Sequence, residues 1–533
     1  MAVSVRSWLA NEAGKHFVLM LWLAANTWLF LDTYLLYSTG QQYHYLYQML
    51  GLGLCISRAS ASVLNLNCSL VLLPMCRSLL TFIRGSHTMS TRRMRRLLDK
   101  SKSFHVTCGV AICIFSAVHV SAHLMNVVNF SASFSEDFPD LNLALPGLSG
   151  VLLVLILLLM FISSSHCIRV CNYEIFWYTH NLFIIFYIIL MVHMVGGALK
   201  YQTNTEAHPP GCLRSSQSLQ EADDLDQKQR CKEDAHFQPH YPQTWLWVSG
   251  PLCLYCVERL FRYIRSSHPV TIVTVIRHPC DVVELRMLKK NFRARPGQVI
   301  SINMKCVSCN SFQCPTENKE TFGIHLRIVG DWTEHFAHLL LPQPRAALEI
   351  LPVVHQRRYP TLYVDGPFGS PSEEVFNYDV SLCIAGGIGV TPFACVLDAL
   401  IERWKSFRLQ RLYFVWVCRE LQSFYWFAEL LCALHEKLWK ENRPDYLNVK
   451  LYVTQKDCQQ SMSELRYRPL AARLQVGRPR WKLLFDEIGK CNKDKRVGVF
   501  CCGPKRISRT LHRLCNSVRS SGATFEFNKE SFS

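Results

Sequence analysis

Four histidines lie inside two long apolar stretches of the chain, where an ionisable or metal-binding side chain is expensive to bury and usually functional. His105 and His119 belong to one stretch, and His180 and His193 belong to another. Two helices that each carry such a pair could hold two haem groups by imidazole ligation, one near each face of a membrane. The alternative is that these histidines are core residues that hydrogen-bond between helices.

The spacing of the histidines pairs them by depth. His105 and His119 are about 21 Å apart along an ideal helix and about 40° from a common face. His180 and His193 are roughly 140° apart, so their helix needs a bend or a local irregularity to bring both rings to one side. Both stretches run in the same direction, and we therefore expect an inner site from His105 with His180 and an outer site from His119 with His193.

Two further polar residues occupy apolar stretches. A buried guanidinium such as that of Arg58 needs an anion, for which a haem propionate is suitable. The alternative partner is Asp32, in an ion pair between helices. His123 follows His119 by one helical turn and could line the outer pocket.

Helices that cross a membrane are needed to position these residues. Hydrophobic residues make up 49% of the 533 residues and charged residues only 18%, whereas a soluble globule has about 25% charged residues. A spanning helix needs roughly 20 apolar residues. Stretches of this kind are predicted at 16–37, 49–83, 104–128, 145–168, 175–197 and 244–263.

The charges of the loops predict the orientation of these spans. The loop at 84–103 has seven basic residues and one acidic residue, whereas the loops at 129–147 and 199–243 together carry a net charge of −5. The basic loop and both termini are therefore expected in the cytosol, in a multi-pass protein of the plasma membrane or the endoplasmic reticulum membrane. In the last exterior loop, Cys212 and Cys231 could form a disulfide or remain free thiols.

The net charge of +18 is unevenly distributed between the two sides. Outside the exterior loops the chain carries +23, on the predicted cytosolic side. This distribution removes nucleic acid as a partner and favours membrane lipid and anionic cofactors. The loop at 84–103 could bind anionic lipid or dock against the C-terminal half, and we favour docking.

The C-terminal half has the pattern of two water-soluble domains. Short β-rich runs predict an antiparallel barrel, and after residue 380 strands alternate with helices, which predicts a parallel doubly wound sheet. The β-rich runs are 270–276, 281–288, 298–304, 322–330 and 361–366.

A glycine-rich turn after the strand at 381–387 has the composition of a diphosphate site. Gly386, Gly387 and Gly389 would let the backbone approach a phosphate, and a helix that begins near Thr391 and Pro392 would stabilise its charge. The alternative is a glycine turn without a ligand.

Other strand ends would complete a nucleotide site. Cys502, Gly503 and Pro504 follow the last expected strand and would place a thiol near a nicotinamide ring. Arg419 and Arg478 could hold a 2′-phosphate and select NADPH. Each arginine could instead be an ordinary solvated side chain.

Taken together, the chain resembles the NADPH oxidase family. The motifs that carry the resemblance are GPFGSP (366–371), GGIGVTPF (386–393), HLRIVGDWT (325–333) and CCGP (501–504). Within the family the chain is similar to the constitutively active, peroxide-releasing type. The segments that carry this likeness are 49–70, HPPGC at 208–212 and FNKESFS at 527–533.

The resemblance implies a fold, an activity and its cofactors. The fold would be a six-helix transmembrane bundle with two haem b groups (1–265), an antiparallel β-barrel that binds FAD (266–372) and an α/β domain that binds NADPH (373–533). Electrons would pass from cytosolic NADPH through FAD and both haems to oxygen on the far side, giving hydrogen peroxide and/or superoxide. A small membrane subunit would form a heterodimer with the chain.

The resemblance also implies residue roles. The haem ligands would be the four histidines named above, and Arg58 and His123 would border the oxygen-reducing edge of the outer haem. His208 would favour the release of hydrogen peroxide, Arg327 would meet the flavin diphosphate, and Phe532 would stack on the flavin.

One departure concerns the flavin site. The family places His-Pro-Phe-Thr on a barrel strand, but this chain lacks about six residues before Cys314, and Ser311-Phe312 is the nearest remnant. The alternatives to an oxidase are therefore a ferric reductase with the same electron path and a catalytically silent variant that binds the subunit. The loop with HPPGC favours the oxidase, because it would cap the outer haem.

Overall fold

The computed structural model describes the chain with several gaps. The described residues are 4–86, 91–132, 144–193, 200–212, 231–290, 292–304, 307–314, 321–341, 359–455, 467–517 and 522–530. They form two compact units: unit 1 comprises Met1–Phe17, Arg77–Lys100 and Glu258–Ser533, and unit 2 comprises Val18–Cys76 and Ser101–Val257. The two units are described separately.

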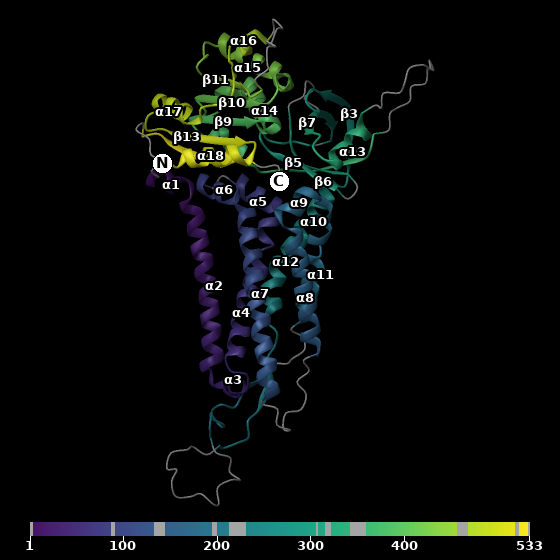
Figure 1. Cartoon of the computed structure of the whole chain (residues 1–533), viewed down its shortest axis with the longest axis vertical. Coiled ribbons are helices and arrows are strands. Elements are labelled where there is room, and N and C mark those ends of the chain that lie inside the picture. The colour runs from purple at the N-terminus through teal and green to yellow at the C-terminus, as the bar shows by residue number, and fades with distance from the viewer. Residues whose placement is uncertain are drawn as a thin grey trace, which may run out of the picture. The chain divides into compact units, whose positions relative to one another are not determined.

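Unit 2 consists mainly of long helices. They are α2 (Ala13–Thr39, which begins in unit 1), α3 (His44–Leu50), α4 (Leu52–Leu70), α7 (Ser101–Ala132), α8 (Ala144–Ser163), α9 (His166–Cys171), α10 (Tyr173–His180), α11 (Phe183–His193) and the first part of α12 (Thr244–Ser266). A short antiparallel ribbon joins β1 (Lys200–Gln202) and β2 (Phe237–Pro239). Helices α4 and α7 lie side by side (Figure 1).

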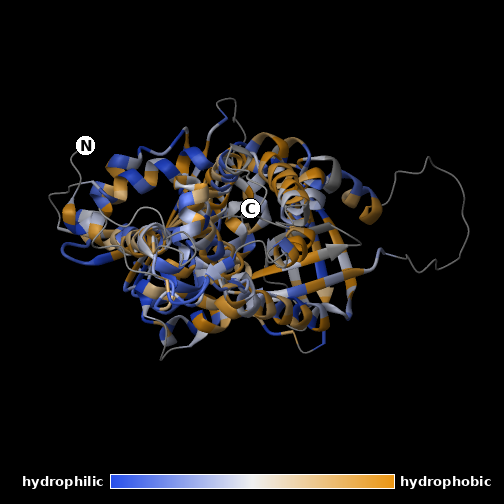
Figure 2. Cartoon of the chain, turned by 90° about the horizontal axis from the view of Figure 1, so that it is seen from below, coloured by the Kyte–Doolittle hydropathy of each residue, from blue (hydrophilic) through white to orange (hydrophobic). Residues whose placement is uncertain are grey.

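Five helical segments among the described residues are long and apolar enough to cross a membrane: Ala13–Thr39, Leu52–Met75, Ser101–Asn129, Pro146–Ser163 and Tyr173–His193. In the view from below, orange hydrophobic residues dominate several of the helices that are seen nearly end-on (Figure 2). Of the six predicted spans, the one at 244–263 is not among these five and stays a prediction. The stretch expected at 244–263 does form helix α12, but charged residues begin at Glu258, so α12 does not meet the same criterion.

The fifth span contains the irregularity that its histidine spacing requires. Helix α10 ends at His180, a turn occupies Asn181 and Leu182, and α11 begins at Phe183. The Asn181 side chain donates a hydrogen bond to the Trp177 carbonyl oxygen at 2.8 Å, which stabilises the interrupted helix end. The break changes the direction of the His180 ring relative to His193.

Unit 1 contains an antiparallel six-stranded sheet in the order β6-β5-β8-β3-β4-β7. Its strands are β3 (Pro269–His278), β4 (Val282–Leu288), β5 (Val299–Met304), β6 (Val307–Phe312), β7 (Thr321–Arg327) and β8 (Leu362–Phe368), and helix α13 (Asp331–Leu340) follows β7. Buried apolar side chains such as Leu285, Ile302 and Ile324 form its core. A single bridge joins Cys314 to Gly323 on β7.

A second sheet of unit 1 has six parallel strands in the order β12-β11-β10-β9-β13-β14. Its strands are β9 (Val380–Gly386), β10 (Arg411–Cys418), β11 (Leu447–Val453), β12 (Leu474–Val476), β13 (Arg496–Cys502) and β14 (Thr524–Lys529). Helices α14 (Thr391–Arg403) and α15 (Ala428–Lys440) pack on one face, and α17 (Trp481–Cys491) and α18 (Lys505–Cys515) pack on the other. Successive residues of β10 point into opposite cores, because strand side chains alternate between the two faces of a sheet. Phe414 lies in the core on one face and Val415 in the core on the other.

Segments distant in sequence complete unit 1. Helix α1 (Val5–Asn11) lies against β14, and the Asn11 side chain donates to the Phe525 carbonyl oxygen at 3.0 Å. Helices α5 (Arg77–Gly85) and α6 (Arg92–Leu98) belong to the same unit. The stretch expected at 49–83 therefore divides into a span, Leu52–Met75, and the helix α5, whose hydrophobic and polar residues lie on opposite faces.

Candidate functional site

The inner histidine pair comes together in unit 2. His105 on α7 and His180 at the end of α10 have ring centroids 6.2 Å apart, with the rings inclined at 70°. Nδ1 of His105 lies 2.8 Å from the Val71 carbonyl oxygen, and Nδ1 of His180 lies 3.2 Å from the Ser164 hydroxyl oxygen. In each ring, one nitrogen is held by a neighbouring helix.

The spacing of this pair fits a shared metal ion. A metal–imidazole bond is about 2 Å long, so two rings that bind one ion from opposite sides have centroids roughly 6 Å apart. The observed separation of His105 and His180 agrees with that value. His105 and His180 would therefore be suited to hold a haem iron between their imidazoles.

The outer histidines repeat the Nδ1 contacts of the inner pair. Nδ1 of His119 lies 2.9 Å from the Ser57 carbonyl oxygen, and Nδ1 of His193 lies 2.8 Å from the Ser149 hydroxyl oxygen. A ligating histidine usually has its other ring nitrogen hydrogen-bonded, because this bond fixes the ring orientation. Since Nδ1 is engaged in all four rings, Nε2 is the nitrogen that would bind iron.

Arg58 and His123 lie near the outer histidines. The rings of His119 and His123 have centroids 4.5 Å apart, and Arg58 interacts electrostatically with both. Nε of Arg58 donates to the Tyr37 hydroxyl oxygen at 3.1 Å. Between Arg58 and Asp32, both described, there is no ion pair, so the alternative partner considered for Arg58 is not found.

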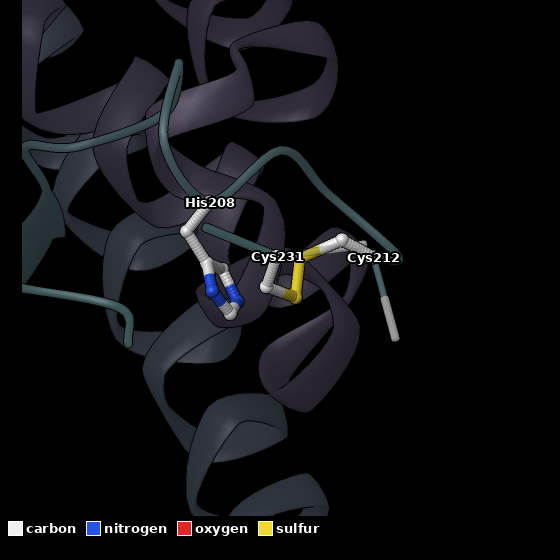
Figure 3. Close-up of side chains that lie close together, drawn as sticks. All are labelled: His208, Cys212 and Cys231. Carbon is white, nitrogen blue, oxygen red and sulfur yellow. A yellow bond between two sulfur atoms is a disulfide. The ribbon is translucent and has the colours of Figure 1, made fainter. Parts of the chain in front are cut away.

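The loop before α12, which is predicted to face the exterior, holds His208 beside a disulfide. Cys212 and Cys231 are bonded, with Cα atoms 5.2 Å apart, and the His208 ring lies next to the sulfur atoms (Figure 3). His208 is fixed on both sides, because Nδ1 lies 2.9 Å from the Glu233 carbonyl oxygen and Nε2 lies 2.7 Å from the Tyr45 hydroxyl oxygen. Both sulfurs are used by the disulfide, so this cluster is not a metal site in its bonded form.

The two glycine motifs of the parallel sheet meet because β9 and β13 are neighbours. A Cβ atom on Gly386 would lie 2.7 Å from Cδ of Pro504, and one on Gly503 would lie 3.1 Å from Cα of Gly386. A Cβ atom on Gly389 would collide with the carbonyl oxygen of Cys502. Glycine is therefore required for the two turns to pack against each other.

Gly387 differs from its neighbours. Its φ of +57° is in the left-handed region, and a Cβ atom there would meet no protein atom within 4 Å. The turn leads into α14, with Pro392 in the first helical positions as predicted and Thr391 Oγ1 donating to the Ile388 carbonyl oxygen at 3.1 Å. Gly387 is thus half-buried, with open space where a Cβ atom would lie, and it precedes the N-terminus of α14, where an anion is stabilised.

The other residues predicted for the nucleotide site differ in how much of their side chains is exposed to solvent. Arg419 and Arg478 follow β10 and β12 at the carboxyl edge of the sheet, and both are exposed. Cys502 is 1% exposed, and burial raises the pKa of its thiol well above the usual value. Its Sγ atom packs against the glycine turn, and its place beside the nicotinamide ring stays a prediction. Phe532 lies outside the described residues.

The flavin region keeps its antiparallel sheet despite the missing tetrapeptide. Strands β5 and β6 pair as a hairpin from Val299↔Phe312 to Met304↔Val307, and Ser311 is buried. Arg327 is exposed at the end of β7, directly before α13. A positive side chain next to a helix N-terminus is suited to a diphosphate.

Sequence reasoning did not find the polar cluster on β3, β4 and β7, at one edge of this sheet. His278, Glu284 and His325 each offer an atom that lies within 4.8 Å of the others. Burial lowers the pKa of His325 to about 3, so its ring is neutral at physiological pH. The motif HLRIVGDWT contains His325, but the two partners come from other strands, and only the sheet register reveals them.

The basic loop forms buried ion pairs within unit 1, as the docking interpretation expected. Arg84 pairs with Asp99, and Arg95 lies 2.8 Å from Glu374. Arg96 donates to the Phe527 carbonyl oxygen at 3.1 Å. These contacts join α5 and α6 to the segment after β8 and to β14, and the acidic partners were not predicted from the sequence.

Comparison with known proteins covers most of the chain. The ferric reductase like transmembrane component matches residues 60–191, the FAD-binding domain matches 267–372, and the ferric reductase NAD binding domain matches 378–516.

Full-length relatives are also found. NADPH oxidase 4 from Homo sapiens and from Mus musculus are each 57% identical to this chain over 578 aligned residues, covering 100% of both chains. NADPH oxidase 1 from Rattus norvegicus is 34% identical and covers 99% of this chain and 100% of its own length. Because this chain has 533 residues, about 45 positions of the 578-residue alignment have no counterpart in it, which agrees with the shortened segments noted in the sequence.

These relatives are named as oxidases, and the matching domains bind FAD, a nicotinamide nucleotide and, in the membrane component, haem. The chain is an integral membrane oxidoreductase that transfers electrons from NADPH. At this identity over its full length, the chain belongs to the NADPH oxidase family.

Proposed function

We propose that this oxidase moves electrons from cytosolic NADPH to oxygen on the exterior side through two haems, and that it releases mainly hydrogen peroxide. His105 with His180 would bind the inner haem, and His119 with His193 the outer one. The observation that carries this proposal is the shared geometry of the four rings, each with Nδ1 held by a neighbouring helix.

When bound, NADPH, FAD and haem supply hydride donation and one-electron transfer. The chain supplies their positions. The backbone at Gly387 and the N-terminus of α14 would hold the NADPH diphosphate, and Arg419 and Arg478 would hold its 2′-phosphate. Arg327 would bind the flavin diphosphate. Arg58 and His123 would border the outer haem, where the guanidinium could neutralise a propionate.

The composition of unit 1 supports the proposed topology. It contains the N-terminal segment, the basic loop and all residues after Glu258, which are the parts predicted to lie in the cytosol. The disulfide Cys212–Cys231 lies in the loop predicted to face the exterior, where disulfides persist. We propose the domains 1–265, 266–372 and 373–533, the plasma membrane or endoplasmic reticulum membrane as location, and a small membrane subunit as partner.

The exterior loop supports peroxide release. Two protons are needed to convert superoxide into peroxide, and His208 is an imidazole in hydrogen-bond contact with a phenol at that loop. A proton source held in place near the outer site would favour dismutation before escape.

A catalytically silent variant is a second candidate, because the flavin tetrapeptide is missing. One experiment separates the candidates: the purified full chain, with the small subunit and added FAD, is mixed with NADPH without oxygen. We expect the absorption change of a bis-histidine haem. His105→Ala should abolish the inner haem, whereas the exposed His268→Ala should behave as wild type. Absence of haem reduction in the wild type would favour the silent variant, and iron reduction without peroxide after oxygen is admitted would indicate a ferric reductase.

A further inference from the structure

Three ligand-type side chains lie on one face of the antiparallel sheet of unit 1. Glu284 on β4 is directly opposite His325 on β7, and Ile276 on β3 is opposite Glu284. His278 is two residues beyond Ile276, so it points to the same face and is a diagonal neighbour of Glu284. The register of three adjacent strands therefore brings two imidazoles and one carboxylate together.

The ring of His325 is buried without a hydrogen-bond partner among the described residues. It is 4% exposed, and neither of its ring nitrogens has a hydrogen bond among the described residues. A buried polar atom without a partner costs free energy, and in native proteins such atoms usually signal a bound ion, water or ligand. Nε2 of His325 lies 3.8 Å from Oε2 of Glu284, too far for a hydrogen bond.

The distances within the cluster are close to those of a tetrahedral metal site. Nε2 of His278 lies 2.7 Å from Oε2 of Glu284, and the three ligand atoms lie within 4.8 Å of one another. In a tetrahedral zinc site with bonds of about 2.0–2.1 Å, the ligand atoms are about 3.3 Å apart. The observed separations of 2.7 and 3.8 Å lie on either side of that value.

The surroundings hold the carboxylate of Glu284 in place. Arg286 donates to the other oxygen of Glu284, Oε1, at 2.7 Å, which fixes the carboxylate and keeps Oε2 directed at the histidines. Such an outer contact is typical of ligating carboxylates. The side chain of His278 is 20% exposed, which provides a path for an ion to enter.

We propose that His278, Glu284 and His325 bind one divalent transition-metal cation of the zinc type, with a fourth position open to water or another donor. Binding replaces the hydrogen that His278 shares with Glu284, so the imidazole would bind the cation through Nε2 in the tautomer that carries its hydrogen on Nδ1. The cation would tie β3, β4 and β7 together beside Phe427, whose ring centroid lies 4.7 Å from that of His325.

The test uses the full chain with FAD, purified with an affinity tag that contains no histidine. After chelator treatment the protein is dialysed against buffered free Zn²⁺, and zinc per chain is measured by mass spectrometry. We expect one zinc per chain with nitrogen and oxygen ligands near 2 Å in zinc X-ray absorption, a measurement that haem does not disturb. His278→Gln should weaken binding at least about tenfold.

The controls separate a metal site from other roles. His338→Gln removes an exposed histidine of α13 in the same part of unit 1 and should leave zinc binding unchanged. Glu284→Gln provides a second ligand variant, and FAD content with thermal unfolding reports whether each variant folds. The proposal is overturned if the wild type binds no zinc at micromolar free Zn²⁺, or if folded His278→Gln binds it as the wild type does. A loss of FAD in His278→Gln without any zinc signal in the wild type would also overturn it and assign the cluster to the flavin.

Discussion

The phenol oxygen of Tyr45 lies 2.7 Å from Nε2 of His208, while Nδ1 of the same ring lies 2.9 Å from the Glu233 carbonyl oxygen. A carbonyl oxygen only accepts hydrogen bonds, so Nδ1 carries a hydrogen. In the neutral ring, Nε2 therefore accepts the hydrogen of the Tyr45 hydroxyl. The tautomer of His208 is set by the backbone, and its second nitrogen faces a proton donor.

This contact predicts a role for Tyr45 in product choice. Tyr45→Phe removes the hydroxyl but keeps the ring, so we expect a several-fold shift from hydrogen peroxide toward superoxide with oxygen consumption little changed. A peroxidase-coupled assay and dismutase-sensitive cytochrome c reduction measure the two products. The matched control is Tyr241→Phe, at an 83% exposed position in the loop that carries His208. An unchanged product ratio in Tyr45→Phe would contradict the role of this hydrogen bond.

The contact between Ser149 and His193 gives a test of the proposed outer haem site. Its hydroxyl is 2.8 Å from Nδ1 of His193, and loss of such an outer contact commonly weakens metal binding 10–100-fold. Ser149→Ala should therefore lose haem when challenged with excess haem-binding apoprotein, as measured by the haem-to-protein ratio. Ser163→Ala, on the same helix but bonded to the Met160 carbonyl oxygen, should retain both haems. Equal retention by the two variants would argue against His193 as a ligand.

Structural features that depend on residues close together in the chain could be predicted from local sequence patterns. The histidine spacing predicted an irregular fifth span, and the helix breaks directly after His180. The glycine turn and the Cys502-Gly503-Pro504 turn were each predicted from a strand followed by a helix. The stretch at 244–263 forms helix α12, but Glu258 and nearby arginines lower its mean hydropathy, so it is not among the five segments that meet the criterion for a span, and the sixth crossing stays a prediction.

Contacts across long sequence distances could not be predicted in the same way. Arg95 and Glu374 are 279 residues apart, and neither has a local signal that names the other. The strands β12 and β14 were also missed; β12 has only three residues, and β14 follows a short irregular stretch. The cluster of His278, Glu284 and His325 depends on the register of three strands, which the sequence alone does not specify.

Two glycines of the turn after β9 allow a test that separates the space needed by the NADPH diphosphate from the packing of the turn itself. Gly387→Ala places a methyl group where no protein atom lies within 4 Å, at a cost of about 1–2 kcal/mol for a non-glycine residue in the left-handed region. The protein should fold, but the KM for NADPH should rise at least tenfold because the methyl group meets the bound diphosphate.

Gly389→Ala provides the contrast. Its methyl group would collide with the Cys502 carbonyl oxygen, so we expect a lower thermal unfolding temperature of unit 1 together with loss of NADPH-dependent haem reduction. If Gly387→Ala left the KM for NADPH unchanged in a folded protein, the diphosphate would bind elsewhere.

The buried carboxylate of Glu530 leads us to expect that the free energy of unfolding depends on pH. Its carboxylate is buried and accepts hydrogen bonds from the Ser370 hydroxyl at 2.9 Å and the Ser372 backbone N–H at 2.5 Å. Burial raises its pKa from 4.5 to about 7, although these hydrogen bonds oppose the rise. Between pH 4.5 and 7 the folded chain therefore holds a proton that the unfolded chain releases. The stabilisation is full below pH 4.5 and is lost as the pH rises through 7, by roughly 3 kcal/mol in total.

Glu530→Gln keeps the side chain neutral at every pH and should remove this slope, so that the variant is more stable than the wild type at pH 8. Calorimetric unfolding of the full chain between pH 5 and 8 measures the difference. Glu436→Gln, an exposed position on α15, should keep the wild-type slope. Because Glu530 ties the end of β14 to the segment after β8, ionisation should also loosen the C-terminal residues, which faster proteolytic removal of the C-terminus above pH 7 would reveal. A wild-type stability that does not fall between pH 5 and 8 would show that Glu530 ionises at its ordinary pKa.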